Sequence, residues 1–150
     1  MTGIRGSYLW TAIVGTGMAE ILSETLAEEL VSIARTATGD SLRSVTYFSR
    51  SDFEQLYLRS DLERDADLNT FVGHEWRGFR DTNNAYQTTE TELGPYAFTI
   101  RAFENGYLLR VGTERAGVLL TTDEVTIQEF EDVAEAIVRS LRDHSESSEH

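Results

Sequence analysis

The sequence predicts an α+β protein in which one antiparallel sheet is covered by helices. Apolar residues recur with helical periodicity in three separate segments, and runs rich in β-branched and aromatic residues lie between them. An Asn-Gly pair joins two of those runs, as in a β-hairpin. Hairpin strands are antiparallel, and amphipathic helices must bury their apolar faces, so the helices should pack on the sheet. The expected order is helix, two strands, helix, three to four strands, helix.

Composition limits the possibilities before any element is assigned. The chain has 150 residues, enough for one domain with a sizeable core. Its formal charge is −13, and all 13 of its basic residues are arginine. Either the chain is an acidic module for a basic partner, or it works in a salt-rich cytoplasm, where a dense carboxylate surface is screened. The spread of acids from Glu20 to Glu149 favours the second explanation.

Several kinds of protein are disfavoured by what the sequence lacks. An acidic surface without a basic stripe repels nucleic acid, so we expect no nucleic-acid partner. The absence of cysteine excludes disulfides, thiol nucleophiles and cysteine-ligated metals. No apolar run approaches the roughly 18 residues of a membrane span, so we expect no membrane partner and predict a cytoplasmic location.

We divide the chain into residues 1–17, 19–142 and 143–150. The first segment loosely resembles a secretory signal, but its apolar part is short and Met18 looks like a natural start. It is interpreted as a leader or an appended segment, with ordinary N-terminal structure and a signal as the alternatives. The middle segment is a single α+β domain. The last is charged and serine-rich, which predicts a disordered acidic tail.

The domain is predicted to begin with a helix and two strands. Apolar residues recur every three or four positions after Ala19, and Gly39 is the expected end of this helix. Residues 41–49 are typical of a strand. Residues 53–59 suit a strand or a short helix, and their aromatic and aliphatic density favours the strand.

A second helix is predicted over residues 67–79, and the polar residues 81–84 should end it. The next segment, 85–91, is polar but rich in tyrosine and threonine, which suits a half-exposed edge strand. After Gly112 the strand either continues past a bulge or turns at residues 114–117 into a further strand at 118–121. A strongly amphipathic helix that begins near residues 122–123 closes the chain.

The hairpin between residues 96 and 121 is the strongest local signal. Asn105 and Gly106 both tolerate the positive φ that a two-residue type I′ turn requires. A turn centred on them pairs Arg101 with Arg110, and side-chain alternation divides the two strands into an apolar and a mixed face. The apolar face, which should meet the core, consists of Phe98, Ile100, Ala102, Leu109 and Val111.

The order of these elements resembles the roadblock or dynein-light-chain topology, a relative of the profilin-like folds. The resemblance covers about residues 19–142 and rests on element order. Four segments also resemble an uncharacterised family of small acidic proteins from halophilic archaea, which would explain the acid excess and the missing lysine. They are GDSLRSV (39–45), DFEQLYLR (52–59), YAFTIRAFENGYLLRV (96–111) and GVLLTTD (117–123). That family has no known catalytic residues, so the resemblance implies no catalytic site.

No pattern of catalytic or metal-binding residues is complete. His74 and Glu75 begin a metalloprotease-type HExxH motif, but Gly78 occupies the position of the second histidine. A phosphate-binding loop needs a Gly-Lys pair that a lysine-free chain cannot supply, and no G-x-S-x-G frame exists. The abundant carboxylates are best explained as a solvated face. We therefore predict no enzymatic activity, no metal and no cofactor.

The candidate binding residues are Arg101 and Arg110, with Phe103 and Leu108 beside them on the mixed face of the hairpin. In the predicted register the two arginines stand opposite each other, which destabilises a sheet unless an anion lies between them. Either a carboxylate on the second or the final helix forms a salt bridge with them, or both guanidinium groups hold an anionic ligand or an acidic partner.

Two functions from different classes fit these features. The first is a non-enzymatic interaction or regulatory domain that acts as a homodimeric scaffold or adaptor for another protein, as the roadblock resemblance implies. The homodimer is expected because strand 85–91 would lie at an open sheet edge, and an open edge invites pairing. The second function is a small-ligand sensor that binds an anionic metabolite.

Overall fold

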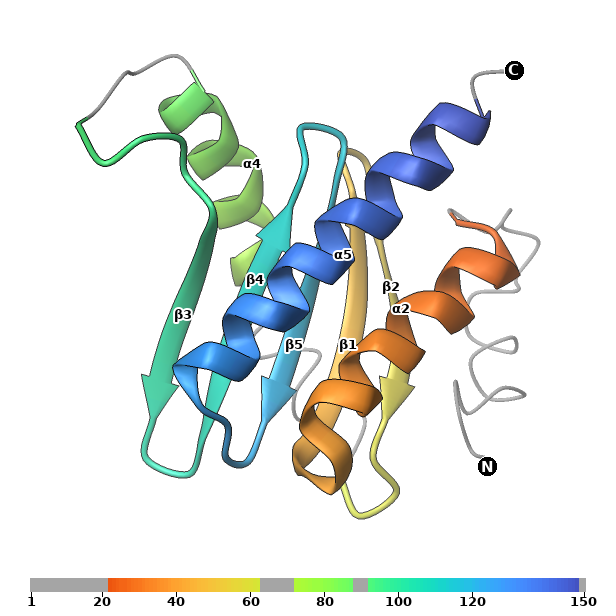
Figure 1. Cartoon of the computed structure of the whole chain (residues 1–150), viewed down its shortest axis with the longest axis vertical. Helices are drawn as coiled ribbons and strands as arrows, with labels where there is room; N and C mark the ends of the chain where they lie inside the picture. Colours follow the sequence, from red (N-terminus) through yellow and green to blue (C-terminus); the bar gives the residue numbers. More distant parts are fainter. Residues whose placement is uncertain (1–21, 63–71, 88–91, 149–150) are drawn as a thin grey trace.

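An antiparallel sheet of five strands forms the centre of the fold, with helices on both faces (Figure 1). The computed structural model describes residues 22–62, 72–87 and 92–148. The strands follow the order β2-β1-β5-β4-β3 across the sheet. The elements are α2 (Glu24–Thr38), the short 3-10 helix η2 (Gly39–Ser41), β1 (Leu42–Ser49), β2 (Phe53–Leu58), α4 (Gly73–Gln87), β3 (Phe98–Phe103), β4 (Gly106–Gly112), β5 (Ala116–Thr122) and α5 (Ile127–Ser148). The predicted α+β class and element order are confirmed.

Helices α2 and α5 lie side by side on one face of the sheet and enclose the larger core (Figure 1). Each helix buries the apolar stripe that its periodicity predicts, and Leu30, Phe130 and Ile137 are at most 1% exposed. Leu109 and Val111 of the predicted apolar face belong to this core. The β3 residues of that face are less covered: Phe98 and Ile100 are half-buried, and Ala102 is exposed.

Helix α4 covers the opposite face with a smaller aromatic core. Its side chains approach the strands closely because glycines form part of the floor: a Cβ added to Gly117 would lie 2.8 Å from the Phe79 ring. The Trp76 indole N–H donates to the Ser49 carbonyl at 2.9 Å, which ties the helix to the end of β1. The buried members of this core are Phe48, Val72, Phe79, Leu108 and Leu119.

The β3–β4 hairpin has a different register from the predicted one. Phe103 pairs with Gly106, so the turn consists of residues 104–105 and lies one position earlier than predicted. Arg101 and Arg110 are therefore not opposite each other. The pairing is shifted by two residues, and because side chains alternate with a period of two, every side chain keeps its predicted face.

Gly106 is needed for a close backbone contact and not for a left-handed turn. It does not have a positive φ. A Cβ added at this position would lie 2.5 Å from the carbonyl oxygen of Thr122 on β5, so only glycine allows the two strands to meet here. This packing requirement places Gly106 at the start of β4, and the register follows from it.

Helix α4 continues beyond the predicted end of the second helix. It crosses residues 81–84, which were expected to stop it, and reaches Gln87, so the predicted strand is wrong at residues 85–87. Polar residues lower helix propensity by only about 0.5 kcal/mol each, which packing against the sheet can offset. The other predicted positions of these two elements, 67–71 and 88–91, lie outside the described residues, and β3 is the edge strand.

Helix α5 begins four or five residues later than predicted. The Thr126 hydroxyl accepts from the Glu129 N–H at 3.1 Å, and the Glu129 carboxylate accepts from the Thr126 N–H at 2.8 Å. This reciprocal pair is a capping box, which fixes the start of the helix. At its other end α5 extends to Ser148, into the segment 143–150 that was expected to be a tail. Residues 1–17 lie outside the described part of the chain.

Candidate functional site

A buried carboxylate on α4 joins two arginines of the sheet. Glu75 Oε1 accepts from Arg110 Nη1 at 2.6 Å, and Glu75 Oε2 accepts from Arg101 Nε at 2.7 Å. The side chains of Glu75 and Arg110 are 3% and 4% exposed, whereas that of Arg101 is 45% exposed. Two guanidinium groups share one carboxylate, and Arg101 is the member of the three that reaches solvent.

Gly78 makes room for the buried guanidinium beneath α4. A Cβ added to Gly78 would lie 2.6 Å from Arg110 Nη1, the nitrogen that also donates to the Glu75 carbonyl at 3.2 Å. The glycine that interrupts the HExxH motif therefore has a packing role. His74 is exposed on the outer side of the helix and takes no part in the cluster.

The structure separates the four predicted binding residues into two groups. Arg101 and Arg110 meet at Glu75, which confirms the predicted salt bridge to the second helix. Leu108 is 1% exposed in the aromatic core, while Phe103 is 49% exposed at the end of β3. Because both arginines bind a carboxylate of the chain itself, the geometry does not favour the alternative in which both hold one external anion.

Strand β3 has an open edge next to this cluster. It pairs with β4 on one side and is the last strand of the described sheet on the other. In this register the N–H and C=O groups of residues 99, 101 and 103 point toward β4. Those of Phe98, Ile100 and Ala102 point away from the sheet, ready to pair with another strand.

Two hollows lie outside the Glu75 cluster. The first has a volume of about 330 Å³ and lies where the β3–β4 turn meets the beginning of β1 and the end of β5. The second, of about 760 Å³, lies between α5 and the uncovered side of β3 and β4. Its floor includes Phe98 and Val111, and Val138 and Arg142 belong to its helical wall.

Asp123 joins the ends of β1 and β2 to the end of β5. Its carboxylate accepts from Arg59 Nη1 at 2.6 Å and from Arg43 Nη1 at 2.9 Å. These hydrogen bonds, that of Arg59 first, hold the pKa of Asp123 below its ordinary value, although partial burial acts in the opposite direction. Arg59 also donates from Nε to Asp61 at 2.7 Å, and both carboxylates raise the pKa of the Arg59 guanidinium.

The arrangement of polar groups on α2 and α5 does not suit nucleophilic catalysis. Ser140 donates to Glu29 Oε2, and His144 Nε2 lies 3.3 Å from Glu29 Oε1. A serine nucleophile needs the histidine between the hydroxyl and the carboxylate, whereas here the carboxylate is central. In the described part of the chain, no three metal-ligating side chains form a group, and no helix is long and apolar enough to cross a membrane.

Sequence reasoning missed two residues that organise these sites. Glu75 was considered only as part of the incomplete HExxH motif, although a lone acid within an apolar stripe is a signal for a buried ion pair. Arg43 lines the smaller hollow and was not singled out. No local motif marks it, because its neighbours come from three other strands.

Comparison with known proteins identifies a family and a fold. A family model described as a domain of unknown function (DUF7522) matches residues 28–142. No curated protein matches the sequence significantly.

Solved structures of MglB resemble the chain. One described as MglB with a tetrameric arrangement has a TM-score of 0.58 and 16% identity over 82% of this chain and 95% of that one. The gliding protein MglB of Thermus thermophilus has a TM-score of 0.52 and 15% identity over 82% and 96%. Myxococcus xanthus MglB has a TM-score of 0.58 and 8% identity over 86% and 96%. At these identities the likeness concerns the fold, and it confirms the predicted roadblock-type topology.

Proposed function

The chain belongs to the DUF7522 family, and we propose that it is a non-enzymatic interaction domain that forms a homodimer through the open edge of β3. The observation that supports this proposal most directly is the outer edge of β3, which pairs with no other strand within the described residues. The strand is short and carries one charge, at Arg101, but the segment Phe98–Phe103 contains no proline or lysine and pairs with β4 without a bulge. The fold that the chain shares with MglB supports the regulatory or adaptor role that we propose.

The backbone of β3 suits antiparallel pairing with a second copy. The outward-facing N–H and C=O groups belong to Phe98, Ile100 and Ala102, and Ile100 is the middle one. A two-fold axis at Ile100 pairs Phe98 of each protomer with Ala102 of the other. All three outward positions then make hydrogen bonds, and the two sheets become one sheet of ten strands.

The side chains on the α4 face favour the same register. With the axis at Ile100, Arg101 stands opposite Thr99 of the second copy, so the two Arg101 side chains do not face each other. With the two-fold axis at Arg101 instead, the Arg101 side chains of the two protomers would stand opposite each other. Like charges directly opposite in a sheet are unfavourable. The charge of the Glu75 cluster therefore selects one register of the dimer.

The dimer would work as an adaptor for another protein in a salt-rich cytoplasm. A continuous sheet with helices on both faces provides a large rigid surface, and the half-exposed Arg101 and Phe103 lie near its centre. Arginine and aromatic residues at such positions often contribute strongly to protein–protein binding. One of the related MglB structures is described as tetrameric, which supports self-association in proteins of this fold.

Light scattering at molar salt tests the dimer by comparing the wild-type chain with a variant that carries a proline in β3. The chain has a mass of 16.9 kDa, so the dimer should have twice that mass. Ala102→Pro removes an outward N–H and leaves the hydrogen bonds of β3 to β4, so the variant should be monomeric and folded. Ala102→Thr, which keeps the N–H at the same exposed position, should remain dimeric. A wild-type chain that is monomeric at tens of micromolar contradicts the proposal.

A further inference from the structure

The smaller hollow, at the end of the sheet where the β3–β4 turn lies, has the features of a ligand site. Its volume of about 330 Å³ is at the lower end of the range for small-molecule pockets, about 300–1,000 Å³. Gly106 belongs to its lining and carries no side chain. Phe103 and Leu108, which point to the α4 face of the sheet, provide its apolar wall.

One charged side chain of the lining has unused hydrogen-bonding capacity. Arg43 uses Nη1 to bind Asp123, and no other side-chain hydrogen bond of its guanidinium is formed within the described residues. Hydrogen bonds in which both groups are charged are roughly twice as strong as neutral ones, so a carboxylate ligand that accepts from the remaining N–H groups of Arg43 gains stability.

From this lining we propose that the hollow binds a small monocarboxylate with an apolar or aromatic body. The free N–H groups of Arg43 suit bidentate binding of a planar carboxylate. The body of the ligand packs against Phe103 and Leu108. Glu104 also lines the hollow and disfavours a second negative charge on the ligand. This site shares no residue with the Glu75 cluster and does not depend on the dimer.

The proposal is tested by titrating the isotope-labelled full chain at fixed molar salt, with backbone amide signals as the readout. The probes are sodium benzoate and benzamide, which have the same shape but differ in charge. Benzoate should shift the amide signals of Gly106, Tyr107 and Thr122, and benzamide should bind about ten-fold more weakly because it lacks the charge-assisted pair. Equal affinities for the two probes, or shifts centred on the larger hollow at α5, overturn the proposal.

Substitutions distinguish benzoate binding in the smaller hollow from non-specific binding of the anion elsewhere on the chain. Arg43→Gln should weaken benzoate binding about ten-fold. Asp123 remains bound to Arg59 in this variant, which preserves the strand ends. Arg142→Gln removes the same charge from the larger hollow and should leave the affinity unchanged. Phe103→Ala shortens a half-exposed wall and should weaken binding several-fold without loss of folding. Unchanged affinity in both Arg43→Gln and Phe103→Ala contradicts the proposed site.

Discussion

Glu75 is the residue on which the α4 face depends most, because its carboxylate binds both Arg101 and Arg110. Glu75→Gln keeps the shape of the side chain but takes this carboxylate away from the buried Arg110. We expect the free energy of unfolding to fall by roughly 3–5 kcal/mol, as when one partner of a buried ion pair is removed. Urea denaturation at molar salt measures the change.

Glu135→Gln is the matched control for this prediction. Glu135 lies 3.9 Å from Arg139, and both side chains are largely exposed, at 74% and 67%. An exposed pair of this kind contributes less than about 1 kcal/mol, and salt screens it further. A loss in Glu75→Gln no larger than that in Glu135→Gln would show that the buried cluster does not stabilise the fold.

Asp123 should make stability depend on pH in the acid range. Its folded-state pKa lies below the unfolded value of about 3.9, so its charge stabilises the fold above that pH. This contribution is lost as the pH falls through the lower, folded-state pKa. Asp123→Asn should therefore be less stable than the wild type at pH 7, and the difference should shrink as the pH falls below about 4. Urea titrations at several pH values check this, and a constant difference would contradict it.

At the scale of the element, α4 can approach the sheet because Gly78 leaves space for Arg110. Gly78→Ala places a methyl group 2.6 Å from Arg110 Nη1, so the buried guanidinium or the helix must move. At Gly73, on the same helix, an added Cβ meets nothing closer than Arg77 Nη1 at 4.0 Å. Alanine favours a helix over glycine by up to about 1 kcal/mol. In thermal melts we expect Gly73→Ala to be neutral or stabilising and Gly78→Ala to be destabilising. Equal changes in melting temperature for the two variants would contradict the packing role of Gly78.

Periodicity made the elements predictable, and it also explains which faces were predicted correctly. The stripes of α2 and α5 and the alternation of β3 and β4 depend only on spacing along the chain. The face of Arg101 and Arg110 was therefore correct although their register was not, because the error was two residues. The Thr126–Glu129 capping box was visible in the sequence and would have placed the start of α5.

What could not be predicted depends on contacts between distant segments. The register of β3 follows from the approach of Gly106 to Thr122, 16 residues further along the chain. The extent of α4 across residues 81–84 was not predicted either, because local propensity is a weak guide to where a helix ends. The hollow at Arg43 combines side chains from four strands, so no single segment of sequence could reveal it.

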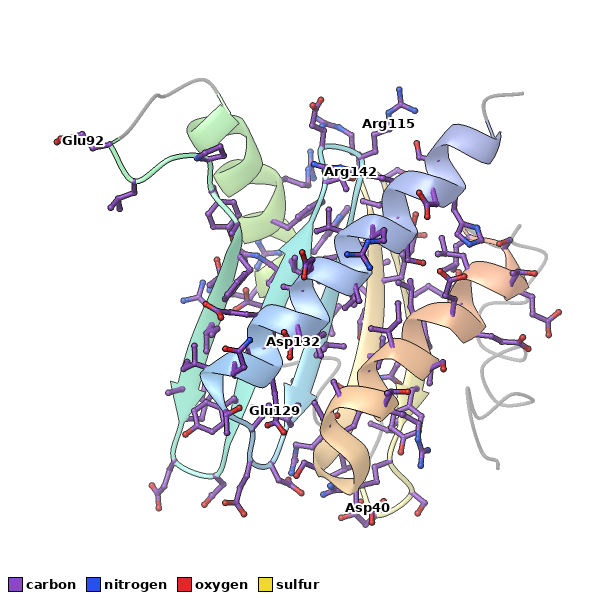
Figure 2. All side chains as sticks on the ribbon, viewed as in Figure 1. Asp40, Glu92, Arg115, Glu129, Asp132 and Arg142 are labelled. Atoms are coloured by element: carbon purple, nitrogen blue, oxygen red, sulfur yellow. The ribbon has the colours of Figure 1, made fainter. Side chains whose placement is uncertain are left out.

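At the scale of the whole molecule, the carboxylates of the described residues lie mainly on the outer surfaces of the helices and loops. Glu129 and Asp132 lie on the first half of α5, Asp40 lies beyond the end of α2, and Arg142 lies near the far end of α5 (Figure 2). Within the described residues, the carboxylates of Glu75 and Asp123 are bound by arginines, whereas acids such as Glu28, Glu131 and Asp132 are exposed. The charge of −13 therefore acts mainly as repulsion across the surface.

This surface repulsion predicts that the protein needs salt for stability. The Debye length falls from roughly 30 Å at 0.01 M salt to about 3 Å at 1 M, so repulsion between helices is screened only at the higher concentration. The melting temperature should rise steeply between these limits. Salt also strengthens the burial of apolar surface, so a charge-reduced variant is needed to separate the two effects. The triple variant Glu28→Gln, Glu131→Gln, Asp132→Asn should have a higher melting temperature than the wild type at low salt and the same melting temperature at 1 M. If the melting temperatures of the two proteins instead rise in parallel with salt concentration, the salt effect is due to apolar burial.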